Sequence, residues 1–120
     1  MGIRLKELPF VFDDKDFILR CNMNVLADVQ EAFDGDFSSA LDGKKSVLSV
    51  ITFLTAMLND YADEKGWSER YNVKQVGRMF QPLELRKLRE QVMGLVASAL
   101  TDDDEEQEEI EEKNVHARQD

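Results

Sequence analysis

The residues best suited to chemistry lie in the stretch CNMNVLADVQEAFDGDF, residues 21–37, which contains the only cysteine and the acidic run Asp34-Gly35-Asp36. A reactive thiol needs a cationic or basic partner that lowers its pKa. Such a site would require a His or Lys close to Cys21. The favoured alternative is a small buried residue at the end of a strand, because unpaired cysteines are among the most buried residue types.

The acidic run can be compared with a calcium-binding loop. If Asp34 were position 1, Asp36 and Ser38 would occupy positions 3 and 5, but Ser39 would replace the glycine of position 6. Lys45 would replace the bidentate glutamate of position 12. The pattern therefore predicts the solvated ends of a helix and a loop, with no metal site.

Catalysis requires an acid, a base or a nucleophile held in a fixed position. The single histidine, His116, lies in the acidic C-terminal segment, and the chain contains no CxxC pair and no glycine-rich phosphate loop. The sequence predicts a protein that is not an enzyme and that needs no cofactor.

Charge is concentrated at the C-terminal end of this 120-residue chain. Residues 1–100 carry 13 Lys/Arg against 15 Asp/Glu, whereas residues 101–120 carry 2 against 10. A net charge of -10 disfavours nucleic acid and anionic membranes as partners. No segment reads as a signal peptide or a membrane span, and one cysteine cannot form an intramolecular disulfide, so the prediction is a soluble cytoplasmic protein.

The elements that would position these residues begin with a hairpin. Residues 3–8 alternate, and the strand-like residues 10–12 and 17–21 flank the polar sequence DDKD of residues 13–16, which predicts a four-residue connection. Pro9 lacks an N–H group and should lie at a strand start or on an edge.

Four helices are predicted after the hairpin from apolar periodicity and capping residues. The first covers residues 23–34, between the Asn22 cap and the Gly35 stop. The second covers residues 46–64, with Ser46 as its cap and with apolar residues over so much of its circumference that it should be the buried centre of a bundle. The third covers residues 73–80 behind Asn72, and the last follows Pro82.

The last helix should end near Leu100. The carboxylates of residues 101–112 would face the negative end of its dipole, which costs up to about 1 kcal/mol. A run with one apolar residue also cannot offset its ordering entropy. The predicted fold is therefore α+β and predominantly α-helical: a short N-terminal β-hairpin and a bundle of about four helices in a domain of residues 1–100, followed by a disordered acidic tail, residues 101–120.

Two aromatic and three basic residues are the candidates for partner binding: Phe37, Trp67, Arg86, Lys87 and Arg89. Phe37 and Trp67 lie in connections and are suited either to an interface or to capping the core from a loop. The basic residues form either a solvated helix face or a dock for an acidic partner or for the protein's own tail.

The order of these segments resembles the tail assembly chaperones of long-tailed bacteriophages and related prophages. The resemblance covers residues 3–100 and rests on a hairpin followed by the sequences NMNVLADVQEAF, SVITFLTAML, NVKQVGRMF and LRKLREQVMGLVASAL. In that family the helix after the hairpin often begins with an Asp-Leu-Asn-Ala-Leu-like phrase and runs to Glu-Glu-Ala-Phe-Gly. The counterparts are residues 22–26 and 30–35, with Asp34 additional before the glycine.

The resemblance implies a protein of the host cytoplasm that binds the tape measure protein, keeps it soluble, helps to recruit tail tube protein and is absent from the mature virion. It also implies a longer form of the protein made by a ribosomal frameshift. The residues Glu112-Lys113-Asn114 are compatible with codons that contain a slippery site. A homo-oligomer is also compatible with the resemblance. The alternatives are an acidic decoy or a small regulatory adaptor that binds a basic host protein.

Overall fold

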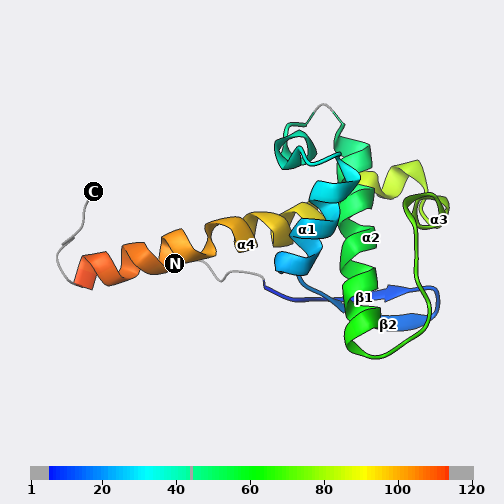
Figure 1. Ribbon diagram of the computed structural model, residues 1–120, viewed down its shortest axis with the longest axis horizontal. Helices are drawn as coiled ribbons and strands as arrows, with labels where there is room; N and C mark the ends of the chain where they lie inside the picture. Colours follow the sequence, from blue (N-terminus) through cyan, green and yellow to red (C-terminus); the bar gives the residue numbers. More distant parts are fainter. Residues whose placement is uncertain (1–5, 44, 114–120) are drawn as a thin grey trace.

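The computed structural model describes the backbone of residues 6–43 and 45–113 and the side chains of residues 6–43 and 45–101. It consists of a two-stranded antiparallel hairpin followed by four α-helices, which confirms the predicted α+β, mainly helical fold (Figure 1). The elements in chain order are β1 (Leu8–Phe12), β2 (Lys15–Leu19), α1 (Met23–Ala32), the 3₁₀ helix η1 (Phe37–Leu41), α2 (Ser46–Glu64), α3 (Val73–Arg78), the 3₁₀ helix η2 (Pro82–Glu84) and α4 (Leu85–Lys113).

The hairpin turn is tighter than the sequence suggested. Only Asp13 and Asp14 form the connection, and Lys15 and Asp16 belong to β2, paired with Phe12 and Val11. Both turn residues have positive φ, 55° and 60°. This is the left-handed geometry of a two-residue turn that matches strand twist, and Asp tolerates it better than most residues. The prediction of a four-residue connection was therefore wrong.

The corner between β2 and α1 has the predicted cap and stop. Asn22 Oδ1 accepts a hydrogen bond from the Val25 N–H (3.0 Å), and Asn22 Nδ2 donates to Asp60 Oδ2 on α2 (2.8 Å). Helix α1 ends at Ala32, two residues earlier than expected, because Asp34 (φ 58°) and Gly35 (φ 88°) both turn left-handed. The Gly35 N–H closes this end on the Gln30 carbonyl at 2.8 Å.

Replacing Asn22 with Ala should lower the free energy of unfolding by about 1–2 kcal/mol, because the helix loses its N-cap. The effect should sit at the upper end of the capping range, because the same side chain also joins α1 to α2 through Asp60. Urea unfolding followed by circular dichroism measures it. Asn22→Asp keeps the acceptor but faces the Asp60 carboxylate, so it should recover only part of the loss.

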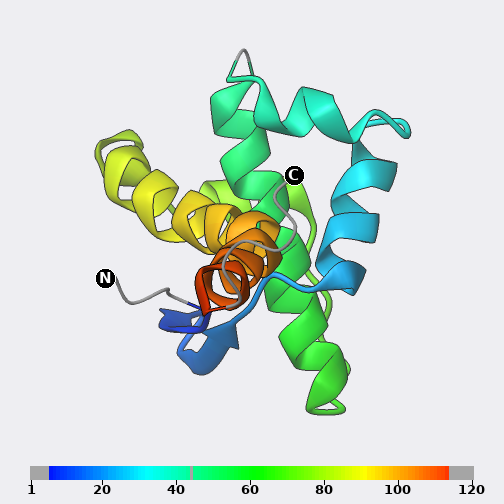
Figure 2. The ribbon, with the colours of Figure 1, turned by 90° about the vertical axis from the view of Figure 1, so that its left-hand side faces the viewer.

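Helix α2 is the centre of the fold, as its apolar circumference predicted. Every residue from 49 to 58 is buried, and β2, α1, α3 and α4 all pack against this helix (Figures 1 and 2). The largest fully buried side chains are Phe17, Leu19, Val25, Val29, Val50, Phe53, Leu54, Met57, Leu58, Val76, Val92 and Leu95. The hairpin and the helices therefore share one core.

Two polar contacts tie the connection after α2 back to that helix. Asn59 Oδ1 accepts from the Tyr71 N–H (2.8 Å), and Asn59 Nδ2 donates to the Tyr71 carbonyl (2.9 Å). Asn72 then caps α3 through a reciprocal pair with Gln75, as predicted, although α3 ends at Arg78 instead of residue 80. Gln81 and Glu84 form a similar pair at η2, which leads into α4.

Helix α4 crosses the body and then leaves it (Figure 1). Its core face is formed by Leu88, Val92, Leu95 and Val96. The helix continues to Lys113, past the end expected near Leu100. Its later part is rich in Glu, a good helix former whose propensity offsets the unfavourable dipole. The side chains after Thr101 and all of residues 114–120 lie outside the described residues, so the flexible acidic tail stays a prediction.

Candidate functional site

The two aromatic candidates lie against the core. Phe37 packs edge-on against Phe53 of α2, with ring centroids 6.1 Å apart. Trp67 packs edge-on against Phe17 (5.5 Å) and Tyr61 (5.6 Å). Both rings are half-buried and contact the hydrophobic core. This arrangement favours the core-capping interpretation over the interface-anchor interpretation.

The three basic candidates are exposed on α4 but point to different sides of it. Lys87 lines a groove between α4 and β1, whereas Arg89 lines a pocket between α4 and the start of α2. Arg86 is exposed one turn before Arg89 and Glu90. None of the three basic side chains forms an ion pair with a residue whose side chain the structure describes. Lys87 and Arg89 thus line two different hollows on the flanks of one helix, and Arg86 lines neither.

The larger hollow, which we call the β1–α4 groove, has a volume of about 540 Å³. Phe10 of β1 packs against Phe80 at a ring distance of 6.3 Å, and the buried Leu88 lies below. The full set of lining residues is Pro9, Phe10, Val11, Phe80, Leu83, Glu84, Lys87, Leu88 and Gln91. Its floor is therefore apolar, and Glu84, Lys87 and Gln91 supply polar groups along one side.

Two large apolar side chains of the groove face solvent. Leu83 is 95% exposed and Val11 is 70% exposed. Leu83 is held outward because it lies in η2, between Pro82 and the Glu84 that pairs with Gln81. Apolar side chains gathered around a concave surface are typical of an interaction site.

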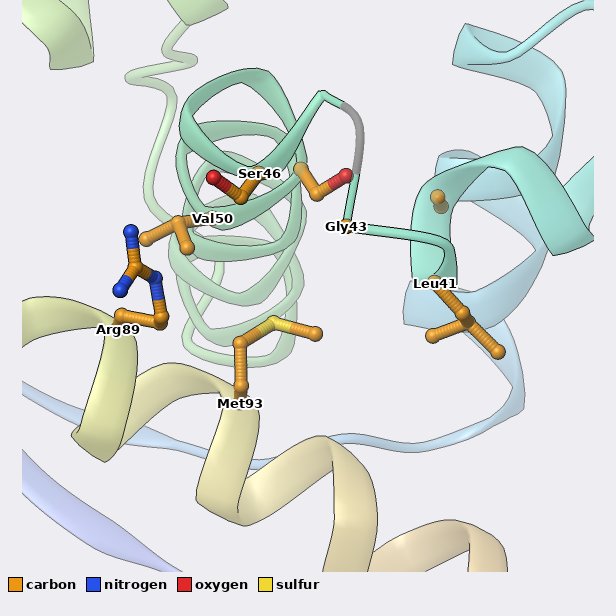
Figure 3. A pocket seen from close by; sticks show the side chains of 8 residues that line it. Leu41, Gly43, Ser46, Val50, Arg89 and Met93 are labelled. Atoms are coloured by element: carbon orange, nitrogen blue, oxygen red, sulfur yellow. The ribbon is translucent and has the colours of Figure 1, made fainter.

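The smaller hollow, which we call the α2 pocket, has a volume of about 140 Å³ and lies at the first turn of α2 (Figure 3). Arg89 and Met93 reach toward it from α4, facing Ser46 and Val50, and Leu41 and Gly43 lie across the hollow. Ala40 and Ser49 complete the lining.

Helix α2 starts without a side-chain cap. The N-cap residue is Lys45, which makes no capping hydrogen bond, and Ser46 is the first residue of the helix and not its cap, contrary to the prediction. The N–H groups of the first helical turn have no partner within a helix, which leaves positive dipole charge at this end. Ser49 is only 3% exposed, and its Oγ has no hydrogen-bond partner. The pocket therefore contains one buried hydroxyl without a partner, beside a helix start that Lys45 does not cap.

Replacing Ser49 with Ala should leave the free energy of unfolding unchanged or raise it by up to about 1 kcal/mol. An unsatisfied buried hydroxyl costs free energy, and Ala is the better helix former. Thr55 provides the comparison, because its equally buried hydroxyl donates to the Ile51 carbonyl at 2.7 Å. Thermal unfolding of Ser49→Ala beside Thr55→Ala measures the difference, and a loss above about 1 kcal/mol in the first variant would mean that Oγ is satisfied in solution.

The side chains that first suggested chemistry are occupied in other ways. Burial raises the pKa of the Cys21 thiol to about 11, which keeps it protonated and unreactive at neutral pH. Asp36 accepts hydrogen bonds from the hydroxyls of Ser38 (2.7 Å) and Ser39 (2.8 Å), which lower its pKa and fix the start of η1.

Among the described residues, no group of three or more His, Cys, Asp and Glu side chains is arranged to hold a metal ion. Within the same residues, no helix has both the length and the apolar character of a membrane span. His116 lies outside the described residues.

Sequence reasoning did not single out Val11, Leu83, Ser49 or Met93. Leu83 carried one usable signal, since it falls outside the apolar stripe of α4 and directly follows a proline. Strand alternation places Val11 on the face opposite to Phe10 and Phe12, but it does not say which face is covered. Their exposure depends on which distant elements pack beside them.

Comparison of the chain with models of known protein families, with curated protein sequences and with solved structures finds no match.

Proposed function

We propose that this chain is a bacteriophage or prophage tail assembly chaperone that binds the tape measure protein during tail morphogenesis. It keeps that client soluble and helps to recruit tail tube subunits, without catalysis. The observation that carries the proposal is the β1–α4 groove, which has an apolar floor and polar groups along one side and is rimmed by the exposed Val11 and Leu83. The order of hairpin and helices, which resembles that family along residues 3–100, supports it.

The groove is better suited to a helix than to an added strand. Pro9 lies in β1 on the groove side of the hairpin and has no N–H to donate to a further strand. An amphipathic helix needs only side-chain contacts with a hydrophobic groove. The resemblance implies that the client, a tape measure protein not yet sheathed, has a helical and apolar surface. Such a surface can supply the apolar face of an amphipathic helix.

The polar residues at the rim of the groove predict which charged residues the client helix carries beside its apolar stripe. Lys87 and Glu84 lie three residues apart on the α4 side and line the groove together. A client helix with an acidic and a basic residue beside its apolar stripe would pair with both. These exposed pairs affect orientation more than affinity, since each contributes at most about 1 kcal/mol.

Co-expression tests the proposal directly. A tape measure protein encoded just downstream of this chain should be insoluble alone, become soluble with this chain, and co-purify with it. If the tape measure protein remains insoluble in the presence of this chain, the proposal fails.

Deletion of residues 101–120 separates the proposal from an acidic decoy. A chaperone that uses the β1–α4 groove should still bind its client after the deletion. A decoy should lose all binding to its basic partner.

A further inference from the structure

We propose that the α2 pocket is a carboxylate-binding site, and that its occupant is the Glu-rich segment of residues 105–112 from a second copy of this chain. This self-association is independent of client binding, since it uses a different flank of α4.

Three features of the pocket favour an anion. The N-cap residue Lys45 makes no side-chain capping bond, Ser49 Oγ is buried without a partner, and the Arg89 guanidinium forms no ion pair with any described side chain. A helix N-terminus and a guanidinium both favour an anion, and a carboxylate accepts several such hydrogen bonds at once. The buried Ser49 hydroxyl distinguishes this pocket from an ordinary solvated helix end. At a solvated end, water would form a hydrogen bond with the hydroxyl.

The rest of the pocket is apolar, so the ligand should combine a carboxylate with aliphatic carbon. Ala40, Leu41, Val50 and Met93 form these walls. The sequence of residues 105–112, EEQEEIEE, supplies glutamates, each with a two-methylene stem, and one isoleucine among them. The charges also match, since residues 101–120 carry 10 Asp/Glu against 2 Lys/Arg while the cationic Arg89 lines the pocket.

The segment cannot come from the same molecule. Helix α4 is continuous from Leu85 to Lys113, so residue 105 lies 16 residues beyond Arg89 on one rod. At 1.5 Å per residue this is about 24 Å, and the helix does not fold back on itself.

A second copy can reach the pocket if two α4 helices pair in antiparallel fashion. With the twofold axis near residue 100, Arg89 of one copy lies level with Glu111 of the other, and the contact occurs twice. Leu100, which is 41% exposed, then lies close to the axis. The Glu-rich end of each helix thereby meets the basic flank of its partner.

Sedimentation velocity of the full-length chain over a range of concentrations tests the proposal. We expect a monomer–dimer equilibrium that weakens with added salt. Arg89→Glu should raise the dimer dissociation constant at least tenfold, and Ser49→Ala should raise it by up to about tenfold. Adding Glu111→Lys and Glu112→Lys to Arg89→Glu should restore the dimer, since the charges are then exchanged.

Arg78→Glu is the matched control, because it makes the same charge change at an exposed site on α3 outside the α2 pocket. It should change the dissociation constant less than twofold. A full-length chain that stays monomeric at every concentration would overturn the proposal. A dimer that Arg89→Glu leaves intact would overturn it too, as would a dimer that Arg89→Glu and Arg78→Glu weaken equally. A dimer broken by Leu83→Asp but not by Arg89→Glu would assign self-association to the β1–α4 groove instead.

Discussion

Replacing both Val11 and Leu83 with Asp should abolish the ability of this chain to keep a tape measure protein soluble. The two residues are 70% and 95% exposed in the free chain, so the new charges remain hydrated and the fold should be retained. In a complex they would be buried without partners. Burying a Val or Leu side chain contributes about 1.5–3 kcal/mol, so losing two such contacts predicts an affinity loss of more than a hundredfold.

The measurement is the soluble fraction of the client on co-expression, together with the melting temperature of the purified variant alone. Met23→Asp is the matched control, because Met23 is 76% exposed at the start of α1, outside the β1–α4 groove. It should leave client binding unchanged. If both variants solubilise the client equally well, the groove is not the binding site, whatever the function of the chain.

Replacing Phe17 with Ala should lower the free energy of unfolding by about 3–5 kcal/mol, the usual cost of truncating a buried Phe. Phe17 is 1% exposed, and its ring contacts Phe12 of β1 together with Tyr61, Trp67 and Tyr71. The variant removes the side chain that joins the hairpin to α2 and to the connection that follows it. Because β1 supplies one wall of the groove, client binding should weaken as well.

Ile18→Ala provides the comparison from the opposite face of β2, where the side chain is only half-buried. Its loss should be less than half that of Phe17→Ala. Chemical denaturation with intrinsic fluorescence and circular dichroism measures both. Equal losses would show that the hairpin is held by its own pairing and not by the aromatic contacts around Phe17.

The elements themselves were largely predictable, because their signals are local. Asn22 and Asn72 place a side-chain acceptor at the start of a helix, and both cap as predicted. The run from Ser46 to Glu64 is apolar over most of its circumference, and its bounds were predicted correctly. Two boundaries were predicted wrongly. Asp13 and Asp14 adopt positive φ and make the hairpin connection two residues long, and Asp34 adopts positive φ together with Gly35, so that α1 ends early.

The fate of the candidate site residues was not predictable in the same way. Phe37 and Trp67 are equally suited to an interface and to a core, and their positions beside Phe53 and Phe17 depend on contacts 16 and 50 residues away in the chain. Arg86, Lys87 and Arg89 form one cluster in the sequence. Helical geometry separates them, since Lys87 lines the groove and Arg89 lines the pocket on the opposite flank of α4, while Arg86 lines neither.

By itself the sequence determined the secondary structure, the helical core and the acidic C-terminal charge of this protein, because capping, periodicity and composition act over a few residues. Only the tertiary structure decided which apolar residues stay outside that core. Leu83 and Val11 are hydrophobic side chains suited to a core, yet they stay exposed at the rim of the groove between β1 and α4. Likewise Ser49 is an ordinary helix residue in the sequence, and only the approach of η1 and α4 makes it a buried donor without an acceptor.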